Sequence, residues 1–87
     1  MRRSFDALAL AVRERLGLDP DSGALFVFAS KRSNRLKVLW FDFNGFCILY
    51  KRLHGAVFEL PDATGSDRPL VAINAGTLAT IIRGVAK

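Results

Sequence analysis

Apolar residues follow a helical spacing at the start of the chain. The positions that repeat with the 3.6-residue period are Phe5, Leu8, Ala9, Val12 and Leu16. Ser4 suits the N-cap of a helix, and Gly17 suits the left-handed residue that ends one. The pattern therefore predicts an amphipathic helix over residues 4–16, with one face available for a core. A type I turn is predicted directly after it, at residues 20–23.

From residue 25 onward the pattern changes to short runs rich in aromatic and β-branched residues, separated by turn signals. These runs predict strands over residues 25–29, 36–42, 46–53 and 56–60. Asn44 and Gly45 are the most specific turn signal, because both central positions of a type I′ turn need a positive φ. Residues 70–73 predict a short fifth strand, and Asn74 suits the N-cap of a final helix. The predicted fold class is α+β, an antiparallel β-meander of about four strands with an N-terminal and a C-terminal helix.

The predicted central strands are apolar on both faces. Alternation in the second strand places Leu36, Val38 and Trp40 on one face and Lys37, Leu39 and Phe41 on the other. Such a sheet needs a helix on each side, or one face held for a partner. We expect Trp40, Phe46 and Tyr50 to share a face, with the spacing of core residues, and to pack in the core rather than to stack on nucleic-acid bases.

Length and composition limit the number of domains and the compartment. The 87 residues are 51% hydrophobic and 24% charged, which is typical of one globular domain, here residues 1–87. The single cysteine, Cys47, cannot form an internal disulfide. No leader-like segment opens the chain, and its apolar runs are too short to cross a bilayer. We therefore expect a cytoplasmic protein with no membrane segment.

Candidate catalytic and metal-binding residues are few. Cys47 lies in an apolar run typical of a small buried residue, and the only histidine, His54, falls in a tight turn. Neither a nucleophile–base pair nor a four-ligand zinc site is predicted. Of the carboxylates Asp42, Glu59, Asp62 and Asp67, three fall at strand ends or in a loop, and we expect solvated carboxylates rather than a metal-binding cluster. We predict no catalytic residue, no metal site and no cofactor.

The positive charges are more informative, because a net charge of +5 favours a polyanionic partner or an acidic protein surface. They concentrate around the first predicted hairpin and the end of the third strand, at Lys31, Arg32, Arg35, Lys37, Lys51 and Arg52. Because antiparallel strands bring these segments to the same end of a sheet, we expect the six charges to converge at one edge. Charged strand ends that keep a sheet soluble explain the same residues equally well.

Several blocks of the sequence resemble a known family. They are Met-Arg-Arg-Ser-Phe-Asp-Ala-Leu at 1–8, Leu-Asp-Pro-Asp-Ser-Gly-Ala-Leu-Phe-Val-Phe at 18–28, Arg-Leu-Lys-Val-Leu-Trp-Phe-Asp at 35–42 and Gly-Phe-Cys-Ile-Leu-Tyr-Lys-Arg-Leu at 45–53. In this order they resemble the small accessory protein of insertion sequence 66 transposons, called TnpB and unrelated to the RNA-guided nuclease of that name. Residues 78–84 resemble the family's leucine-rich ending, whereas residues 61–69 match it poorly.

The resemblance implies a protein encoded beside a separate transposase and needed for transposition. It also implies a β-strand before the first block, and because the sequence starts at that block we expect one sheet edge to lack it. We therefore expect a non-catalytic accessory protein that binds DNA, such as transposon ends, or a co-encoded transposition protein through the six cations. The alternative is a protein-interaction or homodimerisation module without DNA binding, and a metal-dependent enzyme is a third class.

Overall fold

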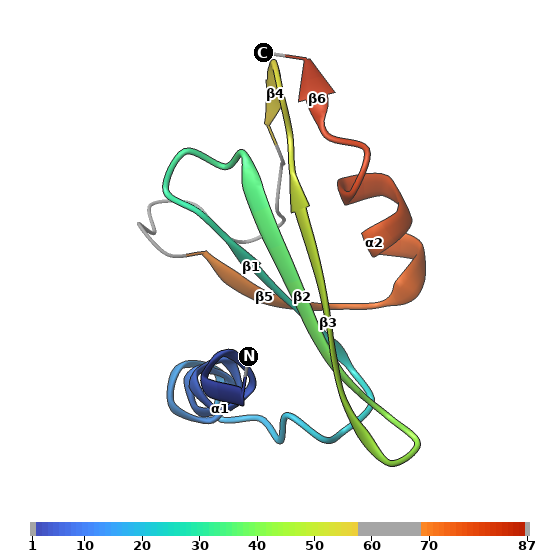
Figure 1. The fold of residues 1–87 in the computed structure, drawn as a ribbon. Coiled ribbons are helices and arrows are strands. Elements are labelled where there is room, and N and C mark those ends of the chain that lie inside the picture. Colours follow the sequence, from blue (N-terminus) through green and yellow to red (C-terminus); the bar gives the residue numbers. More distant parts are fainter. Residues whose placement is uncertain (1, 58–68, 87) are drawn as a thin grey trace.

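The computed structural model describes residues 2–57 and 69–86, shown in Figure 1. In chain order the elements are helix α1 (Arg2–Ala11), the π-helical turn η1 (Val12–Leu16), strands β1 (Leu25–Ala29), β2 (Arg35–Asp42), β3 (Gly45–Arg52), β4 (Ala56–Val57) and β5 (Leu70–Ile73), helix α2 (Ala75–Ile81) and strand β6 (Val85–Ala86). The predicted α+β class is confirmed, because these residues contain an N-terminal helix, a C-terminal helix and an antiparallel sheet of four strands.

The first helix ends where the sequence predicts. Gly17 adopts the left-handed conformation, with φ 65°, and its N–H donates to the Arg13 carbonyl oxygen at 3.1 Å. The helix starts earlier than expected, because Ser4 lies inside α1 rather than at its N-cap. The last turn is π-helical, so the helical segment spans residues 2–16.

The main sheet has the strand order β3-β2-β1-β5, with every neighbouring pair antiparallel. The meander is therefore correct for β1, β2 and β3, but the fourth strand is β5, which pairs with the free side of β1. The predicted strand at 56–60 is a strand at residues 56–57, where β4 pairs with β6 in a separate two-stranded ribbon. Residues 58–60 and the predicted loop up to residue 68 lie outside the described residues.

Each helix covers one face of the sheet (Figure 1). On the α1 side the buried core residues are Val12, Phe26, Leu39 and Leu70, with Phe46 and Ile48 packed against them. On the α2 side they are Val27, Leu36, Val38, Val71 and Ile81, with Trp40 and Leu49 at their border. Of the two alternatives for a sheet that is apolar on both faces, the structure has a helix on each face, and β2 contributes buried residues to both layers.

The turn between β2 and β3 lies one residue earlier than predicted. Asp42 pairs with Gly45, so the central turn residues are Phe43 and Asn44. Of these two only Phe43 has a positive φ, 54°, and its side chain is 95% exposed. The type I′ turn predicted at Asn44 and Gly45 is therefore wrong.

Pairing of apolar side chains across the strands explains the position of this turn. The observed register sets Val38 opposite Leu49, whereas a turn at residues 44–45 would set Val38 opposite Lys51. The same register brings the Phe41 and Phe46 rings into an edge-to-face contact with centroids 5.1 Å apart. Cross-strand contacts of this kind stabilise a sheet by about 0.2–1 kcal/mol each, so together they outweigh the local turn preference.

Candidate functional site

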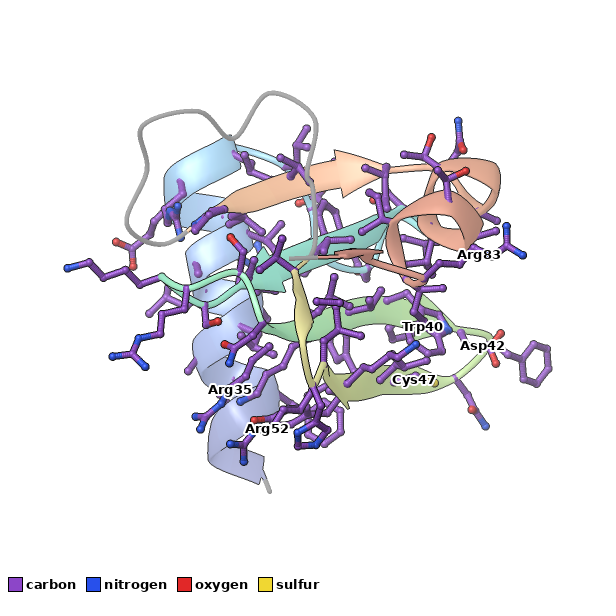
Figure 2. All side chains as sticks on the ribbon, turned by 90° about the horizontal axis from the view of Figure 1, so that it is seen from above. Arg35, Trp40, Asp42, Cys47, Arg52 and Arg83 are labelled. Atoms are coloured by element: carbon purple, nitrogen blue, oxygen red, sulfur yellow. The ribbon has the colours of Figure 1, made fainter. Side chains whose placement is uncertain are left out.

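The positive charges gather at the end of the sheet that lies away from the β2–β3 turn. Arg35, the first residue of β2, lies directly opposite Arg52, the last residue of β3, so their side chains share one face. Figure 2 shows the two side by side, on the far side of the sheet from Asp42. Both side chains are exposed. Antiparallel pairing therefore gives the proximity that the sequence predicts for these two arginines.

The loop between β1 and β2 is held in shape by Ser30. The Ser30 hydroxyl donates to Asn34 Oδ1 at 3.2 Å and accepts from the Arg35 N–H at 3.2 Å. The Ser33 N–H donates to the Ser30 carbonyl oxygen at 2.9 Å, and Ser33 has a φ of 58°. The Asn34 carbonyl accepts from the Leu53 N–H at 2.7 Å, which ties the loop to the end of β3. These bonds fix the backbone of the loop that carries Lys31 and Arg32, whose side chains are exposed.

A hollow of about 310 Å³ lies at this end of the molecule, and we call it the basic hollow. Its lining residues are Ser30, Lys31, Arg32, Asn34, Arg35 and Arg52. Four of the six cations predicted from the sequence are thus brought around one concave surface. Within the described part of the chain, the lining contains no carboxylate. The arrangement offers four positive side chains to an anion.

A second hollow, of about 270 Å³, adjoins the first, and we call it the aromatic slot. Its lining residues are Phe28, Ala29, Ser30, Arg35, Leu36, Lys37 and Tyr50, so Ser30 and Arg35 belong to both hollows. Lys37, the fifth predicted cation, lies here, with its Nζ 5.4 Å from the centroid of the Tyr50 ring. This distance is within the range of a cation–π interaction.

Tyr50 was expected in the core, and this expectation is wrong. Its side chain is 55% exposed, because α1 covers the sheet around Phe26, Leu39 and Phe46 but not the end of β3. Trp40 and Phe46 do pack against core clusters, although on opposite faces of the sheet. Position on an edge strand, directly before Lys51 and Arg52, is the signal in the sequence that could have distinguished Tyr50 from the other two.

Lys51 does not join the other cations. It pairs with Leu36 on the opposite face of the sheet, and its Nζ donates to the Ile82 carbonyl oxygen at 2.9 Å. This carbonyl follows α2, where a positive charge interacts favourably with the helix dipole. The predicted convergence of six charges therefore holds for Lys31, Arg32, Arg35 and Arg52 around one hollow and for Lys37 beside it, and it fails for Lys51.

The other residues considered for chemistry are dispersed. Cys47 is partly buried on β3 opposite Trp40, and His54 and Asp42 are exposed at turns. Glu59, Asp62 and Asp67 lie outside the described residues. Within the described ranges, 2–57 and 69–86, no three His, Cys, Asp or Glu side chains gather closely enough to hold a metal ion. In the same ranges, no helix has the length and apolar character needed to cross a membrane.

A larger hollow, of about 750 Å³, lies between the start of β1, the end of β5 and the first turn of α2. Its lining consists of small, aliphatic and uncharged polar residues, with Asn74 and Thr77 as its main polar side chains. Asn74 Oδ1 already accepts from the Thr77 N–H at 2.8 Å as the N-cap of α2. Although this hollow is larger, it offers no charged side chain to a ligand, so we centre the candidate site on the basic hollow.

Comparison with known proteins agrees with the resemblance in the four sequence blocks. The family model described as IS66 Orf2 like protein matches residues 1–87. The chain is 40% identical over 85 residues to the uncharacterized protein y4hO of Sinorhizobium fredii, covering 98% of this chain and 71% of that protein. It is 35% identical over 60 residues to the uncharacterized protein y4jC of the same organism, covering 69% of this chain and 51% of that protein. No solved structure matches the chain.

Proposed function

The chain belongs to the IS66 Orf2-like family, which supports an accessory role in transposition, and we propose that it performs this role by binding DNA through the basic hollow. In this proposal Arg32, Arg35 and Arg52 contact backbone phosphates, with Lys31 adding charge at the rim. Phosphate contacts of this kind fix the position and orientation of DNA without reading its sequence. The protein then positions DNA and breaks no bond.

The observation that carries the proposal is the direct pairing of Arg35 with Arg52. Like charges that lie opposite each other on neighbouring strands destabilise a sheet, by an amount comparable to the 0.2–1 kcal/mol that favourable pairs contribute. If the two arginines only kept the surface soluble, placing them directly opposite each other would give no benefit. An anion held between the two guanidinium groups would remove the repulsion and form charge-assisted hydrogen bonds, as phosphate does with arginine.

Binding to a transposon-end duplex and to a scrambled duplex, measured by fluorescence anisotropy, tests the proposal. With three or four phosphate contacts, affinity should fall roughly 40- to 150-fold between about 50 mM and 200 mM salt, because log affinity falls by about 0.9 per contact for each tenfold rise in salt. Tighter binding of the transposon-end duplex than of the scrambled duplex would show that direct or shape readout of the sequence adds to the phosphate contacts. Absence of binding at low salt to both duplexes and to the single strands that compose them would refute the proposal.

Two neighbouring residues provide a matched pair of variants. Arg52→Gln and Lys51→Gln remove the same net charge one position apart, but only Arg52 lines the basic hollow. We expect Arg52→Gln to weaken duplex binding several-fold and to reduce the salt slope by about 1, with little effect from Lys51→Gln. Circular dichroism on both variants controls for folding. Equal losses would show that net charge, rather than the basic hollow, attracts DNA.

A role in metal-dependent DNA cleavage would contradict the non-catalytic part of the proposal. Of the four carboxylates considered from the sequence, Asp42 is the one that the structure describes, and it is exposed. Incubating the protein with supercoiled DNA and Mg²⁺, or with Mn²⁺, should leave the DNA intact. Cleavage that disappears in Asp42→Asn would show that the protein acts as a nuclease.

A second candidate function is a protein-interaction module, and exposed apolar side chains favour it. Leu10 is 54% exposed, Leu18 is 44% exposed and Phe43 is 95% exposed. Both faces of the sheet carry a helix, so in this candidate function a second copy or a transposition protein would contact exposed apolar residues such as these rather than an open sheet face. Light scattering separates the two candidates, since a salt-insensitive dimer without DNA affinity would favour the interaction module.

A further inference from the structure

The aromatic slot and the basic hollow form two adjoining rows across the sheet. Phe28 on β1 pairs with Lys37 on β2, and Lys37 pairs with Tyr50 on β3. These three residues make the first row. Arg35 and Arg52 pair two positions further along the strands, and they make the second row on the same face. Two residues along a strand correspond to about 7 Å. An aromatic surface therefore lies next to a cationic one, at a separation comparable to that between the base and the phosphate of one nucleotide.

The exposure of Tyr50 makes this row available to a ligand. The ring is 55% exposed, and the Lys37 ammonium lies 5.4 Å from the ring centroid. Its slot, about 270 Å³, shares Ser30 and Arg35 with the basic hollow, so the two hollows adjoin and one nucleotide can reach both. An exposed aromatic ring flanked by cations is the combination that single-stranded nucleic-acid sites use, with bases stacking on rings and phosphates following the positive charges.

We propose that this pair of hollows binds single-stranded DNA, with one unpaired base stacked on Tyr50 and its phosphate held between Arg35 and Arg52. The inference rests on the proposed function of the basic hollow and specifies which form of DNA the site prefers. In a duplex, each base face is covered by its neighbours, so the Tyr50 ring has no partner there. A single strand supplies both the free base face and the phosphate. The negative phosphate is attracted by the two guanidinium groups, so the phosphate enters the basic hollow and the base enters the aromatic slot.

The test compares a 15-nucleotide oligo(dT) strand with a 15-base-pair duplex by fluorescence anisotropy at one salt concentration. We expect tighter binding of the single strand. The Tyr50→Leu variant should weaken single-strand binding roughly 5- to 100-fold and change duplex binding by less than about twofold, while Tyr50→Phe, which keeps the stacking surface, should bind like the natural protein. The Arg52→Gln variant should weaken binding of both ligands, because each uses the phosphate contact.

Photochemical crosslinking supplies a test on the unmodified protein. An oligo(dT) strand that carries 5-iodouracil should crosslink to the peptide that contains Tyr50. Crosslinks only to other peptides, or equal losses on both ligands in Tyr50→Leu, would overturn the stacking site. Duplex binding without a preference for the single strand would also overturn it and leave the proposed function standing. Absence of binding to both ligands would overturn the proposed function and this inference together.

Discussion

The β2–β3 turn gives the sharpest test of the structure, because Phe43 occupies a backbone conformation that suits glycine. Its φ of 54° places an L-residue in the left-handed region, which costs about 1–2 kcal/mol. A two-residue hairpin with positive φ at its first central position favours glycine there. The Phe43→Gly substitution removes this strain, and because the side chain is 95% exposed it removes almost no buried area.

The expected magnitude follows from two opposing contributions. Relief of the strain stabilises by about 1–2 kcal/mol, and the extra freedom of glycine in the unfolded chain costs about 0.5–1 kcal/mol. The net stabilisation is therefore about 0–1.5 kcal/mol, and its central value of about 0.75 kcal/mol corresponds to a rise in Tm of roughly 3–6 °C for a domain of this size. Thermal unfolding followed by circular dichroism measures the change in Tm. Urea unfolding followed by Trp40 fluorescence measures the change in the free energy of unfolding.

Two control variants determine whether the reasoning holds. Phe43→Ala removes the ring but keeps the Cβ, so its stability should stay within about 0.5 kcal/mol of the natural protein. Gly45→Ala should also be tolerated, because Gly45 has no positive φ and no atom within 4 Å of an added Cβ. In a type I′ turn at Asn44 and Gly45 the same substitution would cost about 1 kcal/mol or more. A destabilised Gly45→Ala together with a destabilised Phe43→Gly would refute the observed register.

Two further predictions concern the packing of the C-terminal segment. Lys51→Met keeps the aliphatic stem but loses the hydrogen bond to the carbonyl after α2, so it should lower the free energy of unfolding by about 1–2 kcal/mol in urea titrations while leaving DNA affinity nearly unchanged. Gly84→Ala should destabilise more than Gly17→Ala, although both residues have a positive φ. A Cβ at Gly84 would lie 2.6 Å from Leu53 Cδ1 and 3.2 Å from the Val57 carbonyl oxygen, whereas nothing lies within 4 Å at Gly17. Equal Tm losses in the two glycine variants would contradict the packing of β6 on β4.

Much of the fold was predictable because local chemistry decides it. The bounds of β1 and β5, the end of the first helix at Gly17 and the Asn74 cap of α2 all depend on residues close in sequence. The position of the turn and the pairing of β5 with β1 were not predictable in this way. The turn depends on which apolar side chains meet across β2 and β3, and the partner of β1 depends on residues 70–73 far along the chain.

The candidate site was predictable only in part, for a similar reason. Antiparallel pairing places Arg35 and Arg52 at the same end of the sheet, and this follows from strand order alone. The alternation of side chains also implies that Lys51 points away from Arg52, but its contact with the carbonyl after α2 needs the helix in place. The exposure of Tyr50 depends on how far α1 extends over the sheet, which the spacing of apolar residues does not determine.

The pairing of β1 with β5 has a consequence for the order of folding. Strands β1, β2 and β3 are joined by short connections, so their ladders close small loops and can form rapidly. The ladder between residues 25–28 and residues 70–73 closes a far longer loop, and its entropic cost delays it. During synthesis on the ribosome, β1 therefore keeps an unpaired edge beside Phe26 and Val27 until residue 73 has emerged. Before that point the nascent chain presents a template for intermolecular strand pairing, which makes this interval the stage at which the protein is most prone to aggregate.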